Sequence, residues 1–401
     1  MRVLMLSWEY PPRIVGGISR HVYDLSQALS ADGIKVDVIT CDHPGAPAEE
    51  VDGNITVHRL SVAEEKDFVH WVHNLNAATE IKAAEILDPL VASGKLKEEP
   101  IVIHAHDWLS EFAGKNIKHK YKLPLVGTVH ATEHGRNHGI NTDLQRYIHG
   151  IEWELCFEAW RVICCSYYMK EEIETTLEVP GDKLDVIANG IDPSKFDVTF
   201  DMADFRKTVA KPNEKIIFFV GRMVREKGVQ VLIQAVKELL PSYNDVKLVI
   251  VGGGDKSHLY ELVEELGVND KVHFTGYVDD ETLMKLYRVA DVAVYPSLYE
   301  PFGIVALEAM AARVPVVVSA VGGLLEVVDH GSTGLTAWTD NPDSLAWAIL
   351  QILSNPFTAK EMAENAYKKA VEQFNWKLIS GQTAGVYNQV WEEYQKSGWG
   401  E

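Results

Sequence analysis

The stretch KIIFFVGRMVREKG, residues 215–228, shows the architecture of the chain most clearly, and a segment with helical periodicity follows it from 228 to 240. Its first six residues have the length and the β-branched and aromatic content of a buried strand. The chain then passes through a polar loop with a glycine at each end into the helix. A strand, a loop and a helix in this order predict one unit of a parallel sheet with crossover helices.

The same alternation of short apolar runs and helix-length segments recurs along most of the chain. A first series of runs rich in Val, Ile and Leu lies at residues 2–8, 35–40, 101–104, 124–130, 161–165 and 184–187. A second series lies at 215–220, 246–251, 272–275, 292–295 and 315–318, and helical periodicity is seen at 228–240, 259–266, 281–290 and 304–312. The sequence therefore predicts an α/β protein with two Rossmann-like, doubly wound parallel-sheet domains.

The length and the breaks in this pattern predict the domain limits. The 401 residues, 46% of them hydrophobic, exceed what one core usually accommodates. Residues 192–213 contain two prolines and no convincing strand, and we place the linker there. The predicted domains are 1–195 and 196–375, facing each other across a cleft that is the expected place for chemistry. Helices are predicted at 342–354, 359–372 and 376–397, and we expect the last, within 376–401, to pack onto the first domain.

The composition of the chain limits the kinds of molecule that it is expected to bind. The net charge of -20, from 58 acidic and 38 basic residues, repels a nucleic acid or an anionic membrane and suits a neutral sugar polymer better. The four cysteines have the spacing of neither a disulfide framework nor a zinc site. The N-terminal apolar run is too short for a signal sequence, and no apolar stretch could span a bilayer. We therefore predict a cytoplasmic protein without membrane insertion.

The loop after the 215–220 strand carries three cations, among them Arg222 and Lys227. In open α/β sheets, ligands bind at the carboxyl ends of the strands, and guanidinium and ammonium groups are suited to a diphosphate. The alternative is a solvated basic loop. The position of the loop after the first strand of its domain favours the phosphate site.

Paired glycines, Gly16 and Gly17, separate the first strand from the first helical segment. Glycines there allow backbone N–H groups to approach a phosphate closely at the positive end of a helix dipole. A plain turn explains the pair equally well.

The strongest local signal is the segment YEPFGIVALE, residues 299–308. Pro301 biases Glu300 away from helix, so a helix is expected to begin after it and to leave the N–H groups near Gly303 to Val305 unpaired. Those groups would suit a phosphate or sugar hydroxyls. Glu308 lies in an apolar segment and either faces solvent or has hydroxyl partners, such as a ribose diol. The alternatives are a carboxylate favoured by the helix dipole and an ordinary exposed glutamate.

Two histidine-rich segments follow strands in the first half, HAHDW at residues 104–108 and HATEHGR at 130–136. Such a cluster suggests a metal, but neither segment lies on a helix as a zinc motif would, and cations for a phosphate are already present. We expect no metal and favour a sugar pocket in which Trp108 offers an apolar face to a pyranose ring. Asn189-Gly190 at the domain junction is open to interpretation as a simple turn.

Together these segments resemble glycosyltransferase family 4, which has the GT-B architecture. The Glu300/Glu308 pair is similar to the E-x7-E signature of that family, and the resemblance covers nearly the whole chain. Within the family, the motifs look most like those of α-1,4-glucan synthases of the glycogen-synthase type. One position departs from a sister family of glycogen and starch synthases, where Lys-x-Gly-Gly stands in the first loop. Ile14 replaces that lysine here, which puts the sister family and its preference for ADP-glucose in doubt, and Arg13 is the nearest charge.

The resemblance implies roles for individual residues. Arg222 and Lys227 would hold the donor diphosphate, Glu308 would bind the ribose, and Glu300 would stabilise the glucosyl cation or bind its hydroxyls. The other implied donor contacts are Gly16, Gly17, Asn189, Phe302, Gly303, Ile304 and Val305, and the loop of Tyr277 and Val278 would contact the base. His130 and Asp107 would contact the transferred glucose, and Trp108 would lie toward the acceptor.

The implied reaction is a retaining, metal-independent transfer of glucose, without a cofactor, from UDP- or ADP-glucose to the non-reducing end of an α-1,4-glucan. Same-face attack is favoured over double displacement with Glu300 as the nucleophile. The alternatives are transfer of mannose or transfer to a lipid or small acceptor, a nucleotide-sugar epimerase, and a non-catalytic nucleotide-sugar-binding protein. The base, the acceptor and the oligomeric state stay open.

Overall fold

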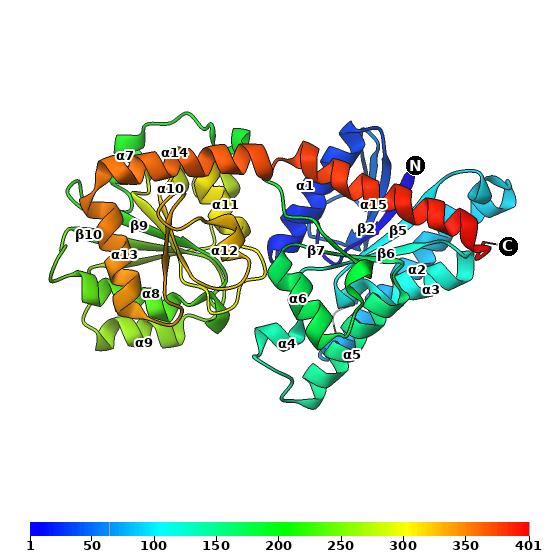
Figure 1. Ribbon diagram of the computed structural model, residues 1–401, viewed down its shortest axis with the longest axis horizontal. Coiled ribbons are helices and arrows are strands. Elements are labelled where there is room, and N and C mark those ends of the chain that lie inside the picture. The colour runs from blue at the N-terminus through cyan, green and yellow to red at the C-terminus, as the bar shows by residue number, and fades with distance from the viewer. Residues whose placement is uncertain (64, 401) are drawn as a thin grey trace. The chain divides into compact units, whose positions relative to one another are not determined.

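The computed structural model describes residues 1–63 and 65–400. These fall into two compact units, one of Met1–Gly190 with Trp376–Glu401 and the other of Ile191–Asn375. Residues 191–195, which we assigned to the first domain from the sequence, thus belong to the C-terminal unit. Each unit is a mainly parallel sheet with helices on both faces (Figure 1). All predicted strands are present, with ends that differ by two residues at most.

The N-terminal unit contains an eight-stranded sheet in the order β3-β4-β2-β1-β5-β6-β7-β8. Neighbouring strands are parallel except β3 and β4, which pair antiparallel at the edge. The strands are β1 Arg2–Leu6, β2 Lys35–Cys41, β3 Glu49–Asp52, β4 Ile55–Leu60, β5 Ile101–His106, β6 Leu125–Val129, β7 Arg161–Cys164 and β8 Leu184–Val186.

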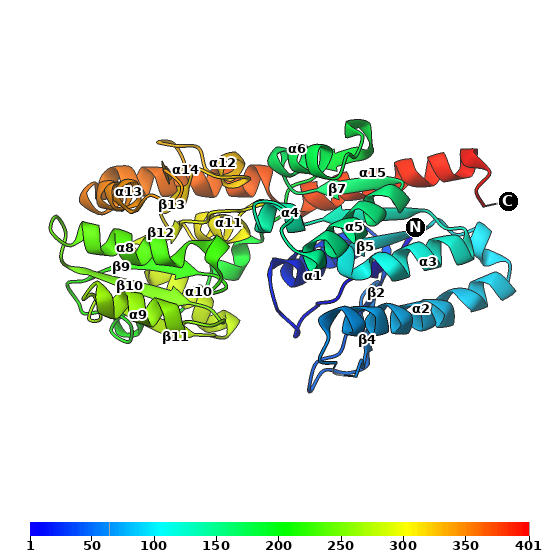
Figure 2. The same ribbon diagram turned by 90° about the horizontal axis from the view of Figure 1, so that it is seen from below.

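Helices cover both faces of this sheet, and Figure 2 shows α15 on one side and α2 on the other. The α-helices are α1 Gly17–Ala31, α2 Phe68–Ala92, α3 Glu111–Tyr121, α4 Glu133–Arg136, α5 Asp143–Glu158, α6 Tyr167–Thr176 and α15 Trp376–Ser397. Short 3-10 turns are η1 Lys95–Lys97, η2 Trp108–Ser110 and η3 Gly181–Lys183.

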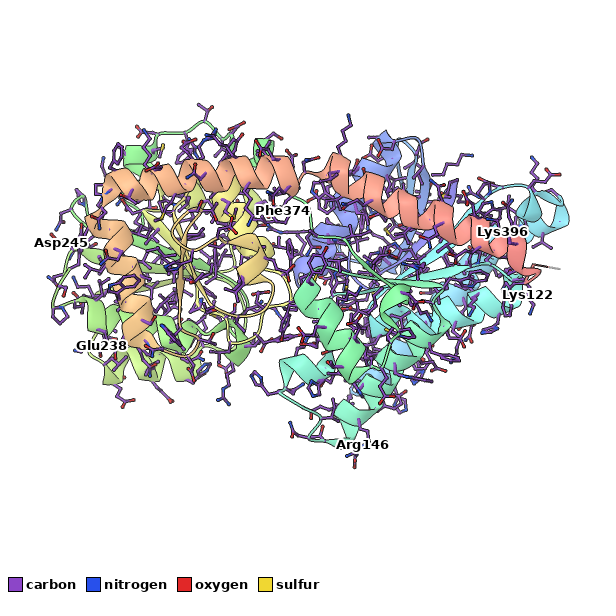
Figure 3. The ribbon with its side chains drawn as sticks, in the orientation of Figure 1. Lys122, Arg146, Glu238, Asp245, Phe374 and Lys396 are labelled. Atoms are coloured by element: carbon purple, nitrogen blue, oxygen red, sulfur yellow. The ribbon has the colours of Figure 1, made fainter. Side chains whose placement is uncertain are left out.

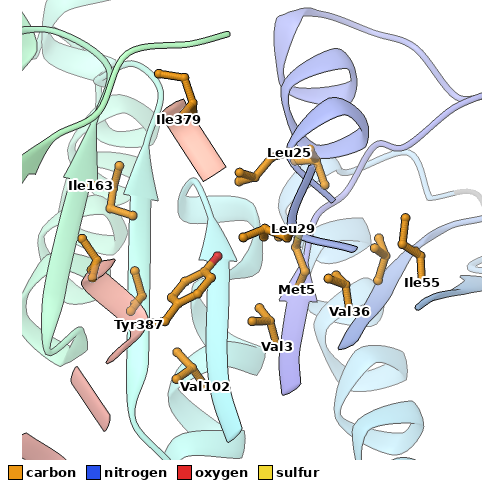
Figure 4. Packing of buried hydrophobic residues seen from close by; sticks show 14 of the residues in the cluster. Val3, Met5, Leu25, Leu29, Val36, Ile55, Val102, Ile163, Ile379 and Tyr387 are labelled. Carbon is orange, nitrogen blue, oxygen red and sulfur yellow. The ribbon is translucent and has the colours of Figure 1, made fainter. Parts of the chain in front are cut away.

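The C-terminal helix α15 is part of the N-terminal core. Its Ile379 and Tyr387 pack with Leu25 of α1 and with Val3 and Val102 of the central strands (Figure 4). The Tyr387 hydroxyl also hydrogen-bonds Nδ1 of a buried histidine of β5, with 2.7 Å between the two atoms. Burying these side chains removes apolar surface from water, so the last helix stabilises the sheet that begins the chain.

The C-terminal unit contains a six-stranded parallel sheet in the order β11-β10-β9-β12-β13-β14. The strands are β9 Lys215–Val220, β10 Val246–Val251, β11 Val272–Gly276, β12 Val292–Tyr295, β13 Val316–Ser319 and β14 Leu335–Ala337. The α-helices are α7 Met202–Arg206, α8 Val229–Leu239, α9 Ser257–Glu265, α10 Asp280–Val289, α11 Ile304–Ala311, α12 Leu324–Val327, α13 Pro342–Ser354 and α14 Pro356–Gln373, with 3-10 turns η4 Pro193–Phe196 and η5 Arg225–Lys227.

The sequence analysis missed three strands, β3, β4 and β14. β4 contains His58 and Arg59, which give the segment a polar appearance, yet both are buried. His58 Nε2 lies 3.2 Å from Asp37 Oδ1 on the adjacent strand β2, and Arg59 pairs with Glu50 of β3 at 2.8 Å. Partners on neighbouring strands therefore satisfy these polar groups inside the sheet.

None of the helices in the described part of the chain is long and apolar enough to cross a lipid bilayer. In the part of the chain that the structure describes, the four cysteines are buried and form no disulfide bond.

Candidate active site

The predicted cation loop lies at the switch point of the C-terminal sheet. β9 is flanked by β10 on one side and β12 on the other, so the winding direction of the sheet reverses there. The loops that follow β9 and β12 leave the sheet side by side at the carboxyl ends of these two strands. Ligands of open α/β sheets bind in the crevice at such a point.

An ion pair joins the two loops. Lys227 Nζ lies 2.7 Å from Glu300 Oε2, and the Ser297 hydroxyl donates to the same oxygen at 3.0 Å. The Lys227 side chain is 23% exposed and that of Glu300 is 9% exposed. The structure thus brings together two predicted site residues that are far apart in the sequence, and it holds the carboxylate in one place at the mouth of the sheet.

Arg222 is an exposed cation of the same loop. Its guanidinium is half exposed and lies 3.3 Å from the carboxylate of Glu226 in an i, i+4 pair. Such surface pairs contribute little to stability. The carbonyl of Glu226 accepts the N–H of Leu298 at 2.7 Å, so the backbone also ties the loops after β9 and β12 together. Arg222 can therefore turn to a ligand at little cost, while the loop beneath it stays fixed.

Helix α11 begins at Ile304 as predicted, and no side chain caps its N-terminus at Gly303. The N-terminal N–H groups of a helix have no intrahelical acceptor and carry partial positive charge. Gly303 has φ +106, and a Cβ there would come 2.5 Å from Leu324 Cδ2, so only glycine fits without strain. The Gly323 N–H donates to the Glu300 carbonyl at 2.9 Å and supports this turn from below.

Two predicted donor contacts of this segment are buried. The Phe302 ring lies 5.8 Å from the ring of Phe374, which is labelled in Figure 3 at the end of α14, so Phe302 can offer a ligand only its backbone. Glu308 is 5% exposed, and its Oε2 accepts a hydrogen bond from the Tyr287 hydroxyl at 2.7 Å. Burial excludes the reading of Glu308 as an ordinary exposed glutamate, and its present partner is a hydroxyl group.

Two further loops lie at the carboxyl edge of this sheet. A Cβ on Gly252 would come 1.8 Å from the Gly221 carbonyl oxygen, and Met223 donates its N–H to Gly253 at 2.9 Å, so the glycine run after β10 packs against the cation loop. Tyr277, 73% exposed, and the half-buried Val278 follow β11. The sequence analysis did not assign a role to the glycines after β10.

In the N-terminal unit the switch point lies between β1 and β5. The loop after β1 folds around Glu9, whose Oε2 accepts the N–H groups of Val15 at 2.6 Å and Gly16 at 2.9 Å. The predicted phosphate contact of the Gly16 N–H is therefore taken by a buried carboxylate of the same loop. Gly17 is the first residue of α1 and carries the open end of the helix.

Arg13 carries the positive charge nearest to Ile14, the position at which the sister family has a lysine. Two aromatic rings hold its side chain. Its guanidinium carbon lies 5.8 Å from the ring centre of Trp8 and 5.7 Å from that of Trp71. Cation–π contacts of this kind fix a guanidinium over a ring face.

Trp108 does not offer an open ring face, contrary to our expectation from the sequence. It is 6% exposed and packs with Val72 and Ile148. The 3-10 turn that follows β5 directs the ring inward between helices, and the chain's own apolar side chains fill the place that we expected a sugar to take.

Asp107 directly follows β5 in a strained backbone conformation. Its φ is +58, a region that residues other than glycine seldom adopt. The carboxylate accepts the backbone N–H of His130 at 2.7 Å, which connects the ends of β5 and β6. Burial raises the pKa of Asp107 to about 6, against the opposing effects of Arg136 and of this hydrogen bond. Strained backbone conformations and perturbed pKa values cluster at functional sites.

The half-buried His130 belongs to a cluster of imidazoles in which His21 and His106 are buried. Its Nε2 lies 3.1 Å from Nδ1 of His106, and its ring centre is 4.8 Å from that of His21. Burial, and secondarily the charge of Arg136, lowers the pKa of His130 to about 3. Burial and then His130 lower the pKa of His21 to about 3 as well. These imidazoles are therefore neutral at physiological pH and can both donate and accept hydrogen bonds.

The cluster surrounds a cavity of about 10 Å³, lined by His21, His130 and Asn189 among others. Hydrogen bonding to Asn189 partly opposes the effect of burial on the pKa of His21. His21, His106 and His130 also have ligand atoms within 4.8 Å of one another, the spacing of a possible metal site.

The sequence analysis did not single out several residues that shape the site. Ser297 and Tyr287 hold the two glutamates, and Glu9 and His21 shape the loop after β1 and the imidazole cluster. Each acts on a residue distant in the sequence or buried by the fold. Glu9 alone had a local signal, as a carboxylate seven residues before a glycine pair in a strand-to-helix loop.

Two doubly wound α/β sheets, each with polar loops at its switch point, have the architecture of a GT-B glycosyltransferase. Residues 15–195 match the family model described as Glycosyltransferase Family 4, and residues 201–369 match Glycosyl transferases group 1. The chain belongs to glycosyltransferase family 4 and has the GT-B fold that the sequence predicted.

Individual relatives agree with this assignment. The chain is 41% identical to an uncharacterized glycosyltransferase of Methanocaldococcus jannaschii, over 96% of this chain and 98% of the relative. It is 36% identical to a glycogen synthase of Mycobacterium tuberculosis, over 96% and 94% of the two chains. The solved structure of a sucrose-phosphate synthase from Thermosynechococcus elongatus superimposes with a TM-score of 0.82 at 26% identity, covering 98% of this chain and 99% of that one.

Proposed function

We propose that this protein transfers glucose from UDP-glucose or ADP-glucose to the non-reducing end of an α-1,4-glucan, with retention of configuration and without a metal ion. The observation that carries the proposal is the Lys227–Glu300 pair at the switch point, beside the exposed Arg222 and the uncapped start of α11. This arrangement supplies cations and backbone N–H groups for a diphosphate and a fixed carboxylate for a sugar. The likeness to a glycogen synthase supports the choice of donor and acceptor.

The proposed chemistry follows from the charges that develop. When the bond between the anomeric carbon and the phosphate oxygen breaks, glucose becomes positive and the diphosphate becomes more negative. Arg222 and Lys227 stabilise the departing diphosphate, a task that fixed cations can perform without magnesium. Lys227 would exchange part of its contact with Glu300 for the phosphate. Glu300 then binds glucose hydroxyls or stabilises the positive sugar.

For retention we favour attack on the face from which the diphosphate leaves. The acceptor oxygen bonds to the anomeric carbon, and the proton of the acceptor hydroxyl passes to an oxygen of the leaving phosphate. No residue then needs to act as a base. For sugar hydroxyls, the N-terminal unit offers the neutral side chains of His130 and Asn189 and the carboxyl group of Asp107 as hydrogen-bonding partners.

The first experiment measures turnover with UDP-glucose, ADP-glucose and GDP-mannose, each with glycogen or maltoheptaose as the acceptor. We expect chain extension with a glucose donor and an α-anomeric signal for the new linkage by NMR. Extension with GDP-mannose alone, or with a lipid or small acceptor but no glucan, would replace the substrate assignment. Conversion of the donor without an acceptor would indicate an epimerase, and tight donor binding without any turnover would indicate a non-catalytic binding protein.

A second experiment separates the two retaining mechanisms. Wild-type protein and a Glu300→Gln variant are incubated with the donor, quenched with acid and analysed by mass spectrometry. Same-face attack predicts no glycosyl adduct on either protein. A covalent adduct on the wild-type carboxylate that is missing from the variant would establish double displacement.

A further inference from the structure

The N-terminal unit has a second cavity, away from the imidazole cluster. It has a volume of about 380 Å³, within the range of roughly 300–1,000 Å³ that is usual for small-molecule sites. One wall is formed by His134 and Gly135 of α4 and by His138 just after it, and the other by one face of α6. Figures 1 and 2 show α4 and α6 as neighbours in this unit.

The wall from α6 offers mainly hydrogen-bond acceptors. The hydroxyl of Thr175 donates to the carbonyl of Glu171, and that of Thr176 donates to the carbonyl of Glu172, each at 2.7 Å. Both hydroxyl oxygens therefore keep lone pairs for a ligand. The side chain of Glu171 is exposed at the rim and adds two more acceptor oxygens.

The base of the cavity is rigid. The hydroxyl of Thr132, which caps α4, donates to a carboxylate oxygen of the buried Glu172. Tyr168 is hydrogen-bonded to the same carboxylate, and burial followed by the charge of Glu172 raises the pKa of its phenol. The ring of Tyr168 is therefore fixed as a flat apolar wall beside polar groups. A polar rim with an aromatic wall is suited to a sugar ring, which has hydroxyls at its edge and C–H groups on its faces.

The lining disfavours anionic ligands and wholly apolar ligands. Among the described residues that line the cavity, none is lysine or arginine, whereas two are glutamates. A phosphate or another anion would meet carboxylates without a lysine or arginine to compensate their charge. An apolar ligand would cover the Glu171 carboxylate and the two threonine hydroxyl oxygens without offering them a hydrogen-bond donor. A neutral molecule with many hydroxyl donors satisfies all of these groups.

We infer that the cavity between α4 and α6 is a second carbohydrate site, which binds a segment of an α-glucan chain. The identity of the ligand rests on the proposed function. α4 begins three residues after His130, so a chain held here lies beside the loop that carries the proposed glucose contact. The site would keep a long acceptor bound between successive transfers and would lower the KM for glycogen more than that for a short acceptor.

The test fills the cavity with a larger side chain and measures whether glucan binding is lost. Thr175 is exposed on the cavity face of α6, and Thr175→Trp is expected to fill the space. Lys170→Trp is the matched control, because a spacing of five residues turns position 170 to roughly the opposite side of the same helix. Glycogen affinity gels and calorimetry with maltoheptaose are run without any nucleotide sugar. We expect Thr175→Trp to weaken binding at least tenfold and Lys170→Trp to leave it within twofold of wild type.

A second variant covers the case in which Thr175→Trp does not fold. Glu171→Ala removes an exposed carboxylate at the rim and is expected to weaken maltoheptaose binding at least threefold. Wild-type binding by both variants, or no glucan binding by the wild-type protein, would overturn the inference. Because binding is measured without a nucleotide sugar, failure of the second site can be distinguished from failure of the proposed reaction. If the wild-type protein extends glucan but Thr175→Trp binds glucan as tightly as the wild type, only the second site is refuted. If binding depends on the cavity but the wild-type protein does not extend glucan, only the proposed reaction is refuted.

Discussion

Replacing Lys227 by methionine tests whether the Lys227–Glu300 pair serves the reaction or only the fold. The substitution keeps most of the length and apolar stem of the side chain and removes the ammonium group 2.7 Å from Glu300 Oε2. In the proposed reaction that ammonium stabilises charge on the departing diphosphate. Loss of one fixed donor to a developing anion costs about 2.7–4 kcal/mol, or roughly 10²–10³-fold in rate. Since the Lys227 side chain is 23% exposed, we expect the lower end, a loss of about 100-fold in kcat.

The same substitution also affects stability, and a double variant separates the two effects. Without Lys227, the carboxylate of Glu300 keeps the Ser297 hydroxyl at 3.0 Å but loses its charge partner, which should cost about 1–3 kcal/mol. Removing the charge of Glu300 as well relieves most of that cost. Lys227→Met with Glu300→Gln should therefore melt closer to the wild type than Lys227→Met alone, yet remain inactive.

The assay is the initial rate of nucleoside diphosphate release at saturating glycogen, with the thermal midpoint recorded on the same samples. Lys285→Met is the matched control, because Lys285 is equally exposed at 23% and pairs with Glu281 on helix α10. We expect the control to keep its activity within twofold. Activity of Lys227→Met within fivefold of wild type, or recovery of activity with stability in the double variant, would refute the assignment of Lys227 to the diphosphate.

Three further predictions concern pH, the support of α11 and metal ions. Burial lowers the pKa of His130 from 6.5 to about 3, so protonation of this residue favours the unfolded chain as the pH falls from 6.5 toward 3. The free energy of unfolding should therefore drop across this window by up to about 5 kcal/mol. The thermal midpoint by tryptophan fluorescence should fall over this window and fall less in His130→Asn, and equal slopes would contradict this. Gly323→Ala places a Cβ 2.3 Å from the Pro301 carbonyl oxygen and should raise the KM for the nucleotide sugar at least tenfold, whereas Gly385→Ala, with open space around it, should not. Initial rates after treatment with EDTA should stay within twofold, and a loss restored by a divalent cation would show that a metal is required.

The sequence predicted those parts of the fold in which the local pattern and the tertiary environment agree. The run at 215–220 is buried on both faces of the sheet, so its continuous apolar composition identifies it. β4 was missed because its histidine and arginine are satisfied by partners on adjacent strands, which no local window contains. β14 has only three residues and is placed by pairing with β13. Such elements depend on neighbours that become adjacent only after folding.

The candidate site likewise has some residues that the local sequence identifies and some contacts that only the folded chain creates. Glu300 and Lys227 could be named from the sequence because a proline, glycines and cations in loops after strands are local features. Their contact across 73 positions could not be named, since it depends on β9 and β12 becoming neighbours. Trp108 was misjudged for the opposite reason. An aromatic residue after a strand can cover a ligand or fill the core, and the position of the surrounding helices decides between the two.

The two units differ in electrostatics in a way that suits glycosyl transfer. Positive charge develops on glucose during the proposed reaction, so a cation beside the sugar would oppose the reaction, whereas one beside the diphosphate would promote it. The C-terminal unit keeps Arg222 and Lys227 partly exposed in the cation loop. The N-terminal unit offers histidines instead, and burial holds the pKa of His130 far below neutral pH. An imidazole can then bind sugar hydroxyls without adding charge, which an exposed histidine or a lysine in its place could not do.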